Sequence, residues 1–433
     1  ESYDMDMIPD GITLRGSDHA GVFYGLQTLI QILETAKTEN LSTLSSVTIK
    51  DRPRFQWRGM MLDVARHMFS TDFVKRYIDI IAEHKMNVFH WHLTEDQGWR
   101  MPIEKYPKLE KISAWRKETL IGHYTDKPRR FDGKRYGGFY TKEEILDVID
   151  YASKRSVTIV PEIEMPGHAT AALSAYPELS CTGGPHEVET LWGIHKEVYC
   201  AGNEETFVFL ENILREVSEI FPGPYIHIGG DECPKTRWEK CKKCQKRIAD
   251  EGLKDEHELQ SYFIKRIEKV LENFDKKLIG WDEILEGGLA PNAIVHSWRG
   301  MNGGIEAANA GHGVVMSPTT YAYFDYYQSD DKENEPLAIG GNLPLEKVYE
   351  FEPVPDKIDR DKRHLILGGQ GNLWTEYIPT EEKAEYMILP RMCALAEAVW
   401  SPRKKRDYPD FVNRLGDHLK RLDRKKLNYR KLD

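Results

Sequence analysis

The sequence predicts an α/β fold in which a TIM (β/α)8 barrel follows part of a small α/β domain. A length of 433 residues suits a barrel of about 250 residues or more together with a minor domain. After Phe55, eight short apolar segments alternate with segments that have the apolar spacing of amphipathic helices. Such alternation favours a parallel sheet, and eight units favour its closure into a barrel. The later helices are weakly patterned, so the pattern alone leaves an open sheet as an alternative.

Residues 1–54 are expected to form the small α/β domain, which would be incomplete. The segments "ESYDMDMI" and "GITLRG" alternate like strands around the turn "PDG", and "VTIKDRPRF" is typical of a third strand that breaks at Pro53. Between them, "SDHAGVFYGLQTLIQILETA" opens on Ser17 and Asp18 as N-cap candidates and has helical spacing. A unit this small makes a poor core by itself, so we expect it to pack against the rest of the chain.

Residues 55–433 are expected to form the barrel. Its strands are predicted at 57–63, 87–93, 157–164, 225–230, 276–281, 293–298, 313–317 and 364–374. Its clearest helices are predicted at 71–85, 141–155, 203–220, 255–274 and 381–400. In TIM-barrel enzymes the catalytic side chains lie at the carboxyl ends of the strands, so the candidate site is expected there.

Composition excludes several classes of partner. Charged residues make up 30% and hydrophobic residues 40% of the chain, which is typical of a soluble globular enzyme. A formal net charge of -10 argues against a nucleic-acid partner, because no basic face stands out that would neutralise phosphates. No apolar run approaches the roughly 20 residues of a membrane span. The chain starts at Glu1, so the lack of a leader carries no information about targeting.

The six cysteines are few for this length. Cys181 and Cys200 bracket a loop-like stretch and would staple it in an oxidising compartment. Cys233, Cys241 and Cys244 lie in "CPKTRWEKCKKC", which contains a C-x-x-C pair. A zinc site would need a fourth ligand at matching spacing, and none follows. Free thiols or a local disulfide are therefore expected there, and no metal site.

Carboxylates and tryptophans gather at the predicted strand ends. Trp281, Trp298 and Trp374 each end an apolar strand. Indole rings stack on the apolar faces of a sugar, while carboxylates and arginine hydrogen-bond its hydroxyl groups. A lone tryptophan at a strand end is usually only packing, but three in this position favour a carbohydrate site.

The segment "PYIHIGGDECPK" places Asp231 and Glu232 side by side after an apolar strand. In an extended strand Asp231 and Glu232 point to opposite faces, so both reach one pocket only if the chain turns near Gly230. Two glycines permit that turn and leave space for a ligand near the backbone. The alternative is that Asp231 caps a helix and Glu232 lies in its first turn.

"YIHIGGDE" resembles the signature of the β-N-acetylhexosaminidases, glycoside hydrolase family 20. Six further segments are similar to family segments in the same order, namely "RFQWRGMMLDVARHMFS", "KMNVFHWHLTEDQGWRMPI", "PEIEMPGHATAAL", "GWDEIL", "YFDYYQ" and "GNLWTEY". The resemblance runs from Phe55 to about Trp400, and residues 1–54 resemble the end of the non-catalytic domain that precedes the barrel in this family. A TIM-barrel glycoside hydrolase is therefore implied.

The resemblance implies a retaining exo-β-N-acetylhexosaminidase that removes terminal non-reducing GlcNAc or GalNAc by substrate-assisted catalysis. The 2-acetamido oxygen of the sugar attacks the anomeric carbon and forms an oxazolinium ion. Asp231 would orient the acetamido group and stabilise the charge on its nitrogen. Glu232 would be the general acid that then activates water. No cofactor and no metal ion are implied.

Further site residues follow from the resemblance, and all would contact the sugar or tune the acid. The implied binding residues are Arg66, Trp281, Trp298, Tyr323, Asp325, Trp374 and Glu376. His168 with an acid after "HL" would form a relay to the general acid. Many relatives have Asp where this chain has Glu95, and Asp where it has Glu164, so the relay acid stays open between Glu95 and Asp96.

Two other functions are alternatives. "HWH" at a strand end, with His168, His227 and His296, would suit a metal-dependent amidohydrolase barrel. That class needs a metal-binding Asp at the end of the last strand, and "GGQGNLWTE" supplies none. A non-catalytic carbohydrate-binding relative is the second alternative, although the implied catalytic residues are all present.

The resemblance also implies a partner and a location. The partner would be a glycan with a terminal β-linked N-acetylhexosamine, and the protein is expected to be exported. In that case Cys181 and Cys200 should form a disulfide, as in some relatives. The sequence leaves open the preference between GlcNAc and GalNAc, the natural linkage and the oligomeric state.

Overall fold

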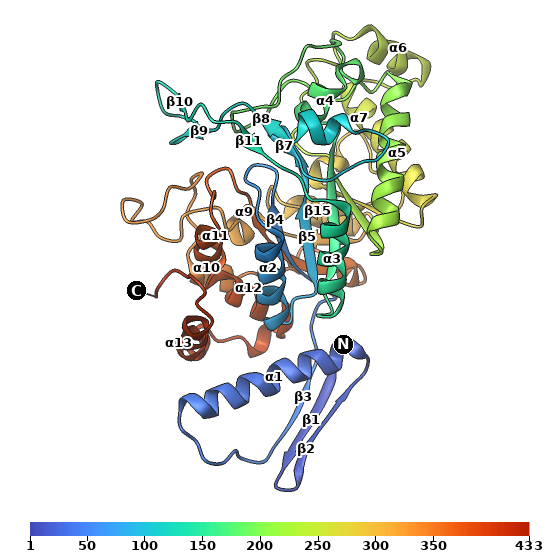
Figure 1. Cartoon of the computed structure of the whole chain (residues 1–433). Helices are drawn as coiled ribbons and strands as arrows, with labels where there is room; N and C mark the ends of the chain where they lie inside the picture. Colours follow the sequence, from blue (N-terminus) through green and yellow to red (C-terminus); the bar gives the residue numbers. More distant parts are fainter. Residues whose placement is uncertain (433) are drawn as a thin grey trace.

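Residues 1–432 are described by the computed structural model, and their centre is a closed parallel barrel (Figure 1). Around the barrel the strands run in the order β12, β13, β14, β15, β16, β17, β4, β5. Their bounds are β4 (Trp57–Asp63), β5 (Val88–His92), β12 (Thr158–Met165), β13 (Tyr225–Gly229), β14 (Lys277–Trp281), β15 (Ile294–Ser297), β16 (Val314–Met316) and β17 (Ile366–Leu373). Parallel pairing of β17 with β4 closes the sheet. The predicted TIM barrel is confirmed, and the open sheet is wrong.

Helices cover the outside of the barrel (Figure 1). Their bounds are α2 (Thr71–Glu83), α3 (Lys142–Ser153), α4 (Thr170–Ala175), α5 (Glu204–Ile220), α6 (Lys242–Asp250), α7 (Glu256–Glu272), α8 (Asn302–Asn309), α9 (Thr319–Ala322), α10 (Leu345–Tyr349), α11 (Glu381–Ile388), α12 (Arg391–Trp400) and α13 (Tyr408–Arg424). α2 begins after Ser70, whose side chain accepts a hydrogen bond from the Phe73 N–H. It then buries one apolar face, including Phe73, Tyr77 and Ile81, as its spacing predicts.

The helix predicted over 381–400 is wrong in one respect, because the chain forms two helices there. α11 ends at Ile388 and α12 begins at Arg391. Pro390 lies between them and has no N–H with which to continue the helical hydrogen bonds. A buried Arg391 at this junction donates to the carbonyl oxygens of Phe324 and Leu343 and so ties the break to the loop after β16.

Residues 1–51 form a three-stranded antiparallel sheet with one helix, β1 (Tyr3–Ile8), β2 (Gly11–Gly16), α1 (His19–Thr38) and β3 (Val47–Asp51), in the order β2, β1, β3. Asp18 caps α1 by accepting from the Gly21 N–H at 2.8 Å. This unit packs on the barrel through Arg58, which is fully buried and bonds to Glu1 and the Tyr24 hydroxyl. In Figure 1 it lies below the barrel, at the end away from α4 and α6.

The barrel interior changes character along its axis. At the end nearer the amino termini of the strands it is apolar, with Trp57, Val88, Val160, Ile279, Ile294 and Val315 packed together. Toward the carboxyl ends the inward side chains become polar and remain fully buried, among them His90, Glu162 and His296. Burying so many ionisable groups is costly unless they pair, so this end of the barrel is built for chemistry rather than for stability.

Short hairpins and loops enclose the carboxyl ends of the strands. The hairpin of β6 (Thr94–Glu95) and β7 (Gly98–Trp99) follows β5 directly. Two further small ladders lie in the long connection before α3, and they pair β8 (Trp115–Arg116) with β11 (Tyr136–Gly137) and β9 (Leu120–Ile121) with β10 (Arg130–Phe131). None of the helices within residues 1–432 is long and apolar enough to span a bilayer.

The expected disulfide is wrong, whereas the free thiols expected of Cys233, Cys241 and Cys244 are confirmed. All six cysteines are free thiols, so the expected Cys181–Cys200 disulfide is not formed. The fourth sulfur that the C-x-x-C pair lacks in the sequence is present in space, since Cys181 and Cys200 lie beside Cys241 and Cys244. The missing partners come from upstream, in the loop after β12, rather than from the residues that follow.

Candidate active site

Asp231 and Glu232 lie in a sharp turn directly after β13. Gly229 and Gly230 have φ values of +67° and +92°, and Glu232 itself has φ +43°, which is uncommon for a residue with a side chain. A Cβ on Gly229 would lie 1.7 Å from a carboxylate oxygen of Glu164, so only glycine fits there. The chain continues without an α-helix until α6, so the interpretation of Asp231 as a helix cap is wrong. The turn brings both carboxylates to the same nitrogen of His168.

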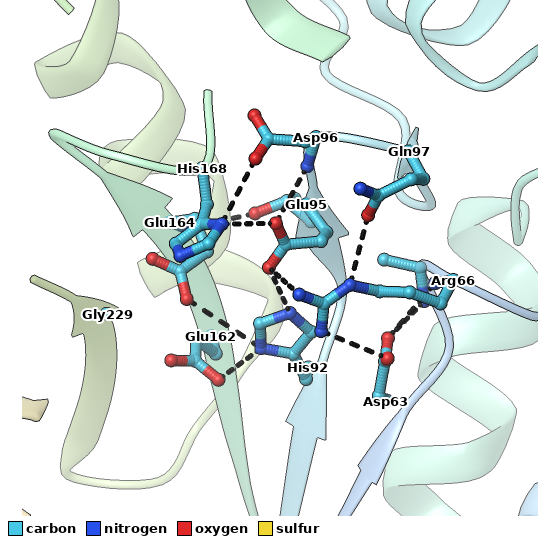
Figure 2. A network of polar contacts seen from close by, with 12 residues as sticks. Asp63, Arg66, His92, Glu95, Asp96, Gln97, Glu162, Glu164, His168 and Gly229 are labelled. Carbon is cyan, nitrogen blue, oxygen red and sulfur yellow. Dashed lines mark hydrogen bonds and ion pairs between the residues drawn. The ribbon is translucent and has the colours of Figure 1, made fainter. Parts of the chain in front are cut away.

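His168 lies between the Asp231 and Glu232 carboxylates and the acids after β5. Figure 2 shows its contacts with Glu95 and Asp96. Its Nε2 lies 3.6 Å from Asp231 Oδ2 and 3.5 Å from Glu232 Oε2. Its Nδ1 lies 2.6 Å from Glu95 Oε1 and 3.1 Å from Asp96 Oδ2. Burial acts to lower the pKa of His168, but Glu95, Asp96 and Glu232 outweigh it and raise this pKa well above its usual value. The imidazole is therefore held as a cation between two pairs of carboxylates.

Both acids that the sequence leaves open touch His168, but they differ in their other partners. Glu95 Oε2 also lies 3.2 Å from a guanidinium nitrogen of Arg66. Asp96 accepts the His168 hydrogen bond with one oxygen and the Thr170 N–H, at 2.9 Å, with the other. Asp96 therefore fixes the ring, while Glu95 is shared between His168 and Arg66.

Arg66 lies on the opposite side of the site, among acids (Figure 2). Its guanidinium is 3.2 Å from Asp63, 3.9 Å from Glu376 and donates to Gln97 at 3.0 Å. It also lies 5.1 Å from the ring centroid of Trp374, in cation–π geometry. The structure thus brings Arg66, Trp374 and Glu376 together, although they come from opposite ends of the barrel sequence.

The aromatic residues of the predicted site form two pairs. Trp281 and Trp374 have ring centroids 5.8 Å apart, and Trp298 stacks on Tyr323 at 6.0 Å. The Trp298 indole N–H donates to Glu283 at 2.9 Å, which fixes the ring. Trp281 is only 1% exposed and lies deepest, whereas Trp298 and Trp374 are partly exposed. The pairs can therefore wall a ligand from two sides.

Several buried carboxylate oxygens near the turn lack a hydrogen-bond partner among the described residues. They are Asp231 Oδ1, Asp325 Oδ1 and both oxygens of Glu164. Burial, with Glu283 and Glu232 beside it, raises the pKa of Asp231 well above its usual value, against the opposing charge of His168. Burial and the nearby Glu376 likewise raise the pKa of Asp325. Unsatisfied buried polar atoms are expensive, so these atoms mark where a ligand supplies hydrogen bonds.

A second network beneath the site is organised by Glu162, to which the sequence assigns no role. Its oxygens lie 2.8 Å from His227 Nδ1, 2.9 Å from His90 Nε2 and 2.9 Å from the Trp281 indole nitrogen, and His92 also contacts it. Burial acts to raise the pKa of Glu162, but the histidines outweigh it and hold this pKa well below its usual value. The carboxylate thus pairs with the buried imidazoles around it.

Several other residues that contact the site were given no role from the sequence. They are Asp63, Gln97, Glu162, Glu164 and Glu283. Glu162 and Glu164 are two residues apart on β12, so they share its inward face, as do His90 and His92 on β5. A pair of ionisable residues at this spacing inside an apolar strand is the signal that would have found Glu162 and Glu164, whereas Asp63, Gln97 and Glu283 lie outside this pattern.

The two carboxyl groups on β12 should respond to pH in opposite directions. Burial, with Asp231 and Glu162 nearby, raises the pKa of Glu164 well above its usual value. A group with a raised native pKa stabilises the fold fully below its unfolded pKa of about 4.3, and this contribution is lost as pH rises. We therefore expect Glu164→Gln to gain Tm relative to the unmodified protein progressively between pH 5 and pH 9.

Glu162→Gln is the matched control on the same strand. Because the native pKa of Glu162 is lowered, its contribution is present above pH of about 4.3 and is lost as the pH falls through the native pKa. Glu162→Gln should therefore lose Tm most at neutral pH and less at pH 4. Differential scanning fluorimetry of both variants across this range checks the signs, and parallel trends would contradict the assignment.

Comparisons with known proteins agree with this geometry. The model described as "Glycosyl hydrolase family 20, catalytic domain" matches residues 55–403, and "Glycosyl hydrolase family 20, domain 2" matches residues 1–52. A "Beta-hexosaminidase" of Porphyromonas gingivalis is 50% identical over 99% of this chain and 54% of that protein. Another "Beta-hexosaminidase", of Vibrio furnissii, is 38% identical over 89% of this chain and 63% of that protein.

A solved structure has the same fold. The GH20 exo β-N-acetylglucosaminidase of Vibrio harveyi, in complex with N-acetylglucosamine, is 36% identical, with a TM-score of 0.86, over 99% of this chain and 67% of that chain. This chain spans about half the length of the Porphyromonas relative. The amidohydrolase alternative is wrong, since the catalytic-domain match includes the whole barrel. The chain belongs to glycosyl hydrolase family 20.

Proposed function

We propose that the protein is a retaining exo-β-N-acetylhexosaminidase that acts on terminal β-linked N-acetylhexosamine. The observation that carries this proposal is the turn after β13, which brings Asp231 and Glu232 side by side against the imidazole of His168. Two adjacent carboxylates suffice if the substrate supplies its own nucleophile. Membership of the family and the names of the relatives support the same activity.

The two carboxylates divide the chemistry between them. The acetamido oxygen attacks the anomeric carbon while Glu232 gives a proton to the departing glycosidic oxygen. Glu232, at 32% side-chain exposure, can reach both the leaving group and water, whereas Asp231, at 12%, lies deeper. Asp231 orients the acetamido N–H and stabilises the positive charge of the oxazolinium ion. Glu232 then takes a proton from water, and this water attacks the anomeric carbon and opens the oxazolinium ring.

The remaining site residues hold the sugar. Arg66, Asp325 and Glu376 hydrogen-bond the ring hydroxyl groups, and Tyr323 hydrogen-bonds the acetamido carbonyl. The three predicted tryptophans wall the ring and the acetamido methyl group. His168, held by Asp96 and Glu95, positions the Glu232 carboxylate. The similar Vibrio harveyi enzyme is in complex with N-acetylglucosamine, which supports this sugar as the terminal residue of the substrate.

An assay of the purified chain tests the proposal directly. Aryl β-N-acetylglucosaminide should be hydrolysed, and the matching plain β-glucoside should not, because it lacks the internal nucleophile. Comparison with the matching galactosaminide shows whether the site prefers GlcNAc or GalNAc. The first product seen by NMR should be the β anomer, because the acetamido oxygen and then water each invert the anomeric carbon once. An α product, equal turnover of the plain glucoside, or sugar binding without turnover would reject the mechanism.

Arg66→Lys should raise KM by about 10–100-fold, since a lost charge-assisted hydrogen bond is worth about 1.5–3 kcal/mol. Lysine keeps the charge that Asp63, Glu95 and Glu376 need, but it lacks the planar fork. Arg66→Ala would leave three buried acids unpaired. Its effect on substrate binding could then not be separated from its effect on folding. Steady-state kinetics beside Arg130→Lys, an exposed control on β10, check the effect.

Exo action follows if Arg66, Asp325 and Glu376 close the pocket around one terminal sugar. A time course on a chitooligosaccharide should then release monosaccharide from the first turnover. Internal fragments that accumulate ahead of the monosaccharide would contradict the closed pocket. We also propose that the protein is exported to meet its glycan, and fractionation of cells that express the whole protein tests this.

A further inference from the structure

Four cysteine sulfurs lie close together, and none of these cysteines belongs to the proposed catalytic or sugar-binding residues. Their Sγ atoms, from Cys181, Cys200, Cys241 and Cys244, all lie within 4.8 Å of one another. The closest pairs are Cys200–Cys244 at 3.6 Å, Cys200–Cys241 at 3.7 Å and Cys181–Cys244 at 3.8 Å. Cys181 is partly exposed and the other three are buried.

These distances match metal coordination rather than disulfides. A tetrahedral zinc ion with Zn–S bonds of about 2.3 Å holds its sulfurs about 3.8 Å apart. The S–S bond of a disulfide is about 2.05 Å long. A disulfide between any two of these cysteines would pull their sulfurs together and break the even spacing of the four. We propose that Cys181, Cys200, Cys241 and Cys244 bind one structural Zn²⁺ ion as a tetrathiolate site. The four thiols give up their protons to solvent when the ion binds.

The backbone around the cluster is shaped for close approach. A Cβ on Gly202 would lie 2.2 Å from the Lys243 carbonyl carbon and 2.4 Å from the Cys244 nitrogen, so only glycine lets the two loops meet. Four protein ligands fill a tetrahedron, and such a closed site is structural rather than catalytic.

The position of the site gives it a mechanical role. Cys181 and Cys200 lie in the loop after β12, which carries His168, while Cys241 and Cys244 follow the β13 turn that carries Glu232. The Tyr199 N–H donates to Pro166 O at 2.9 Å, and the Trp238 indole N–H donates to Tyr199 O at 2.9 Å. The ion therefore ties together the two loops whose relative position sets the contact between His168 and Glu232.

Metal analysis of the full chain, purified without a metal-binding tag, tests the site independently of any activity. We expect about one zinc per chain by mass spectrometry. Cys244→Ser and Cys181→Ser should each lower the zinc content at least tenfold. Cys233→Ser is the matched control, because Cys233 lies in the same segment but outside the cluster, and it should keep its zinc.

A thiol count separates zinc from disulfides even if a variant fails to fold. Protein unfolded with a chelator and without reductant should show six reactive thiols for each zinc released. Two thiols and no zinc would mean that the cluster is a pair of disulfides and would overturn the proposal. The proposal would also be overturned if zinc-free protein took up less than a tenth of an equivalent of added zinc. One equivalent of bound iron instead of zinc would overturn it as well.

Discussion

Glu232→Gln is expected to lower kcat/KM by about 10²–10⁴-fold on substrates with poor leaving groups, which is the usual range for loss of a general acid. Glutamine keeps the shape of the side chain but has no acidic proton to give. Glu232 lies 3.5 Å from the His168 ring, which carries a positive charge in the folded protein because the acids around it raise its pKa. This contact holds the Glu232 side chain in place for the proton transfer.

The leaving group decides how this prediction is measured. On an aryl glycoside whose leaving group needs no protonation, Glu232→Gln should lose far less activity than on a natural disaccharide. Exposed Glu187→Gln, which removes only a surface contact with Lys117, is the control and should leave both rates unchanged. A loss of the same size on both substrates would mean that Glu232 acts by charge or position, not by proton transfer.

The barrel was predictable because parallel strands are buried on both faces. β4 is buried along its whole length, and its predicted bounds, 57–63, agree with Trp57–Asp63 in the structure. Helix ends were harder, since the break at Pro390 interrupts an apolar pattern that continues on both sides. Between β14 and β15 the chain forms only a short 3-10 turn, Asp282–Leu285, which explains why no clear helix pattern was visible there.

The candidate site was predictable in part, because strand ends of a barrel converge by topology. That rule places Arg66 beside Trp374 without any knowledge of side-chain geometry. It does not reveal that both neighbouring acids, Glu95 and Asp96, contact His168, because that depends on side-chain geometry. It also missed the sulfur cluster, in which Cys181 and Cys244 are 63 residues apart and meet only because consecutive loops of the barrel pack together.

Asp231→Asn should lower kcat by about 10²–10³-fold, the range found when one group that stabilises a developing charge is removed. Unlike the loss in Glu232→Gln, this loss should be the same for good and poor leaving groups, because the oxazolinium charge develops in both cases. A thiazoline mimic of the intermediate should bind the variant less tightly by a comparable factor. Isothermal titration of the mimic measures this independently of turnover.

The surroundings of Asp231 add a test by pH. Burial, with Glu283 and Glu232 beside it, raises the pKa of Asp231 in the free enzyme well above its usual value. Catalysis needs its anion, so kcat/KM should fall on the acid side at a pH above the ordinary aspartate range of about 3.5–3.9, and this fall should disappear in Asp231→Asn. Glu283→Gln removes one of the acids that raise the pKa of Asp231, so it should move the acid limb to lower pH. If the acid side of the pH profile were unchanged in both variants, another group would be responsible for this titration. Asp231 would then not be the residue that stabilises the positive charge of the oxazolinium ion.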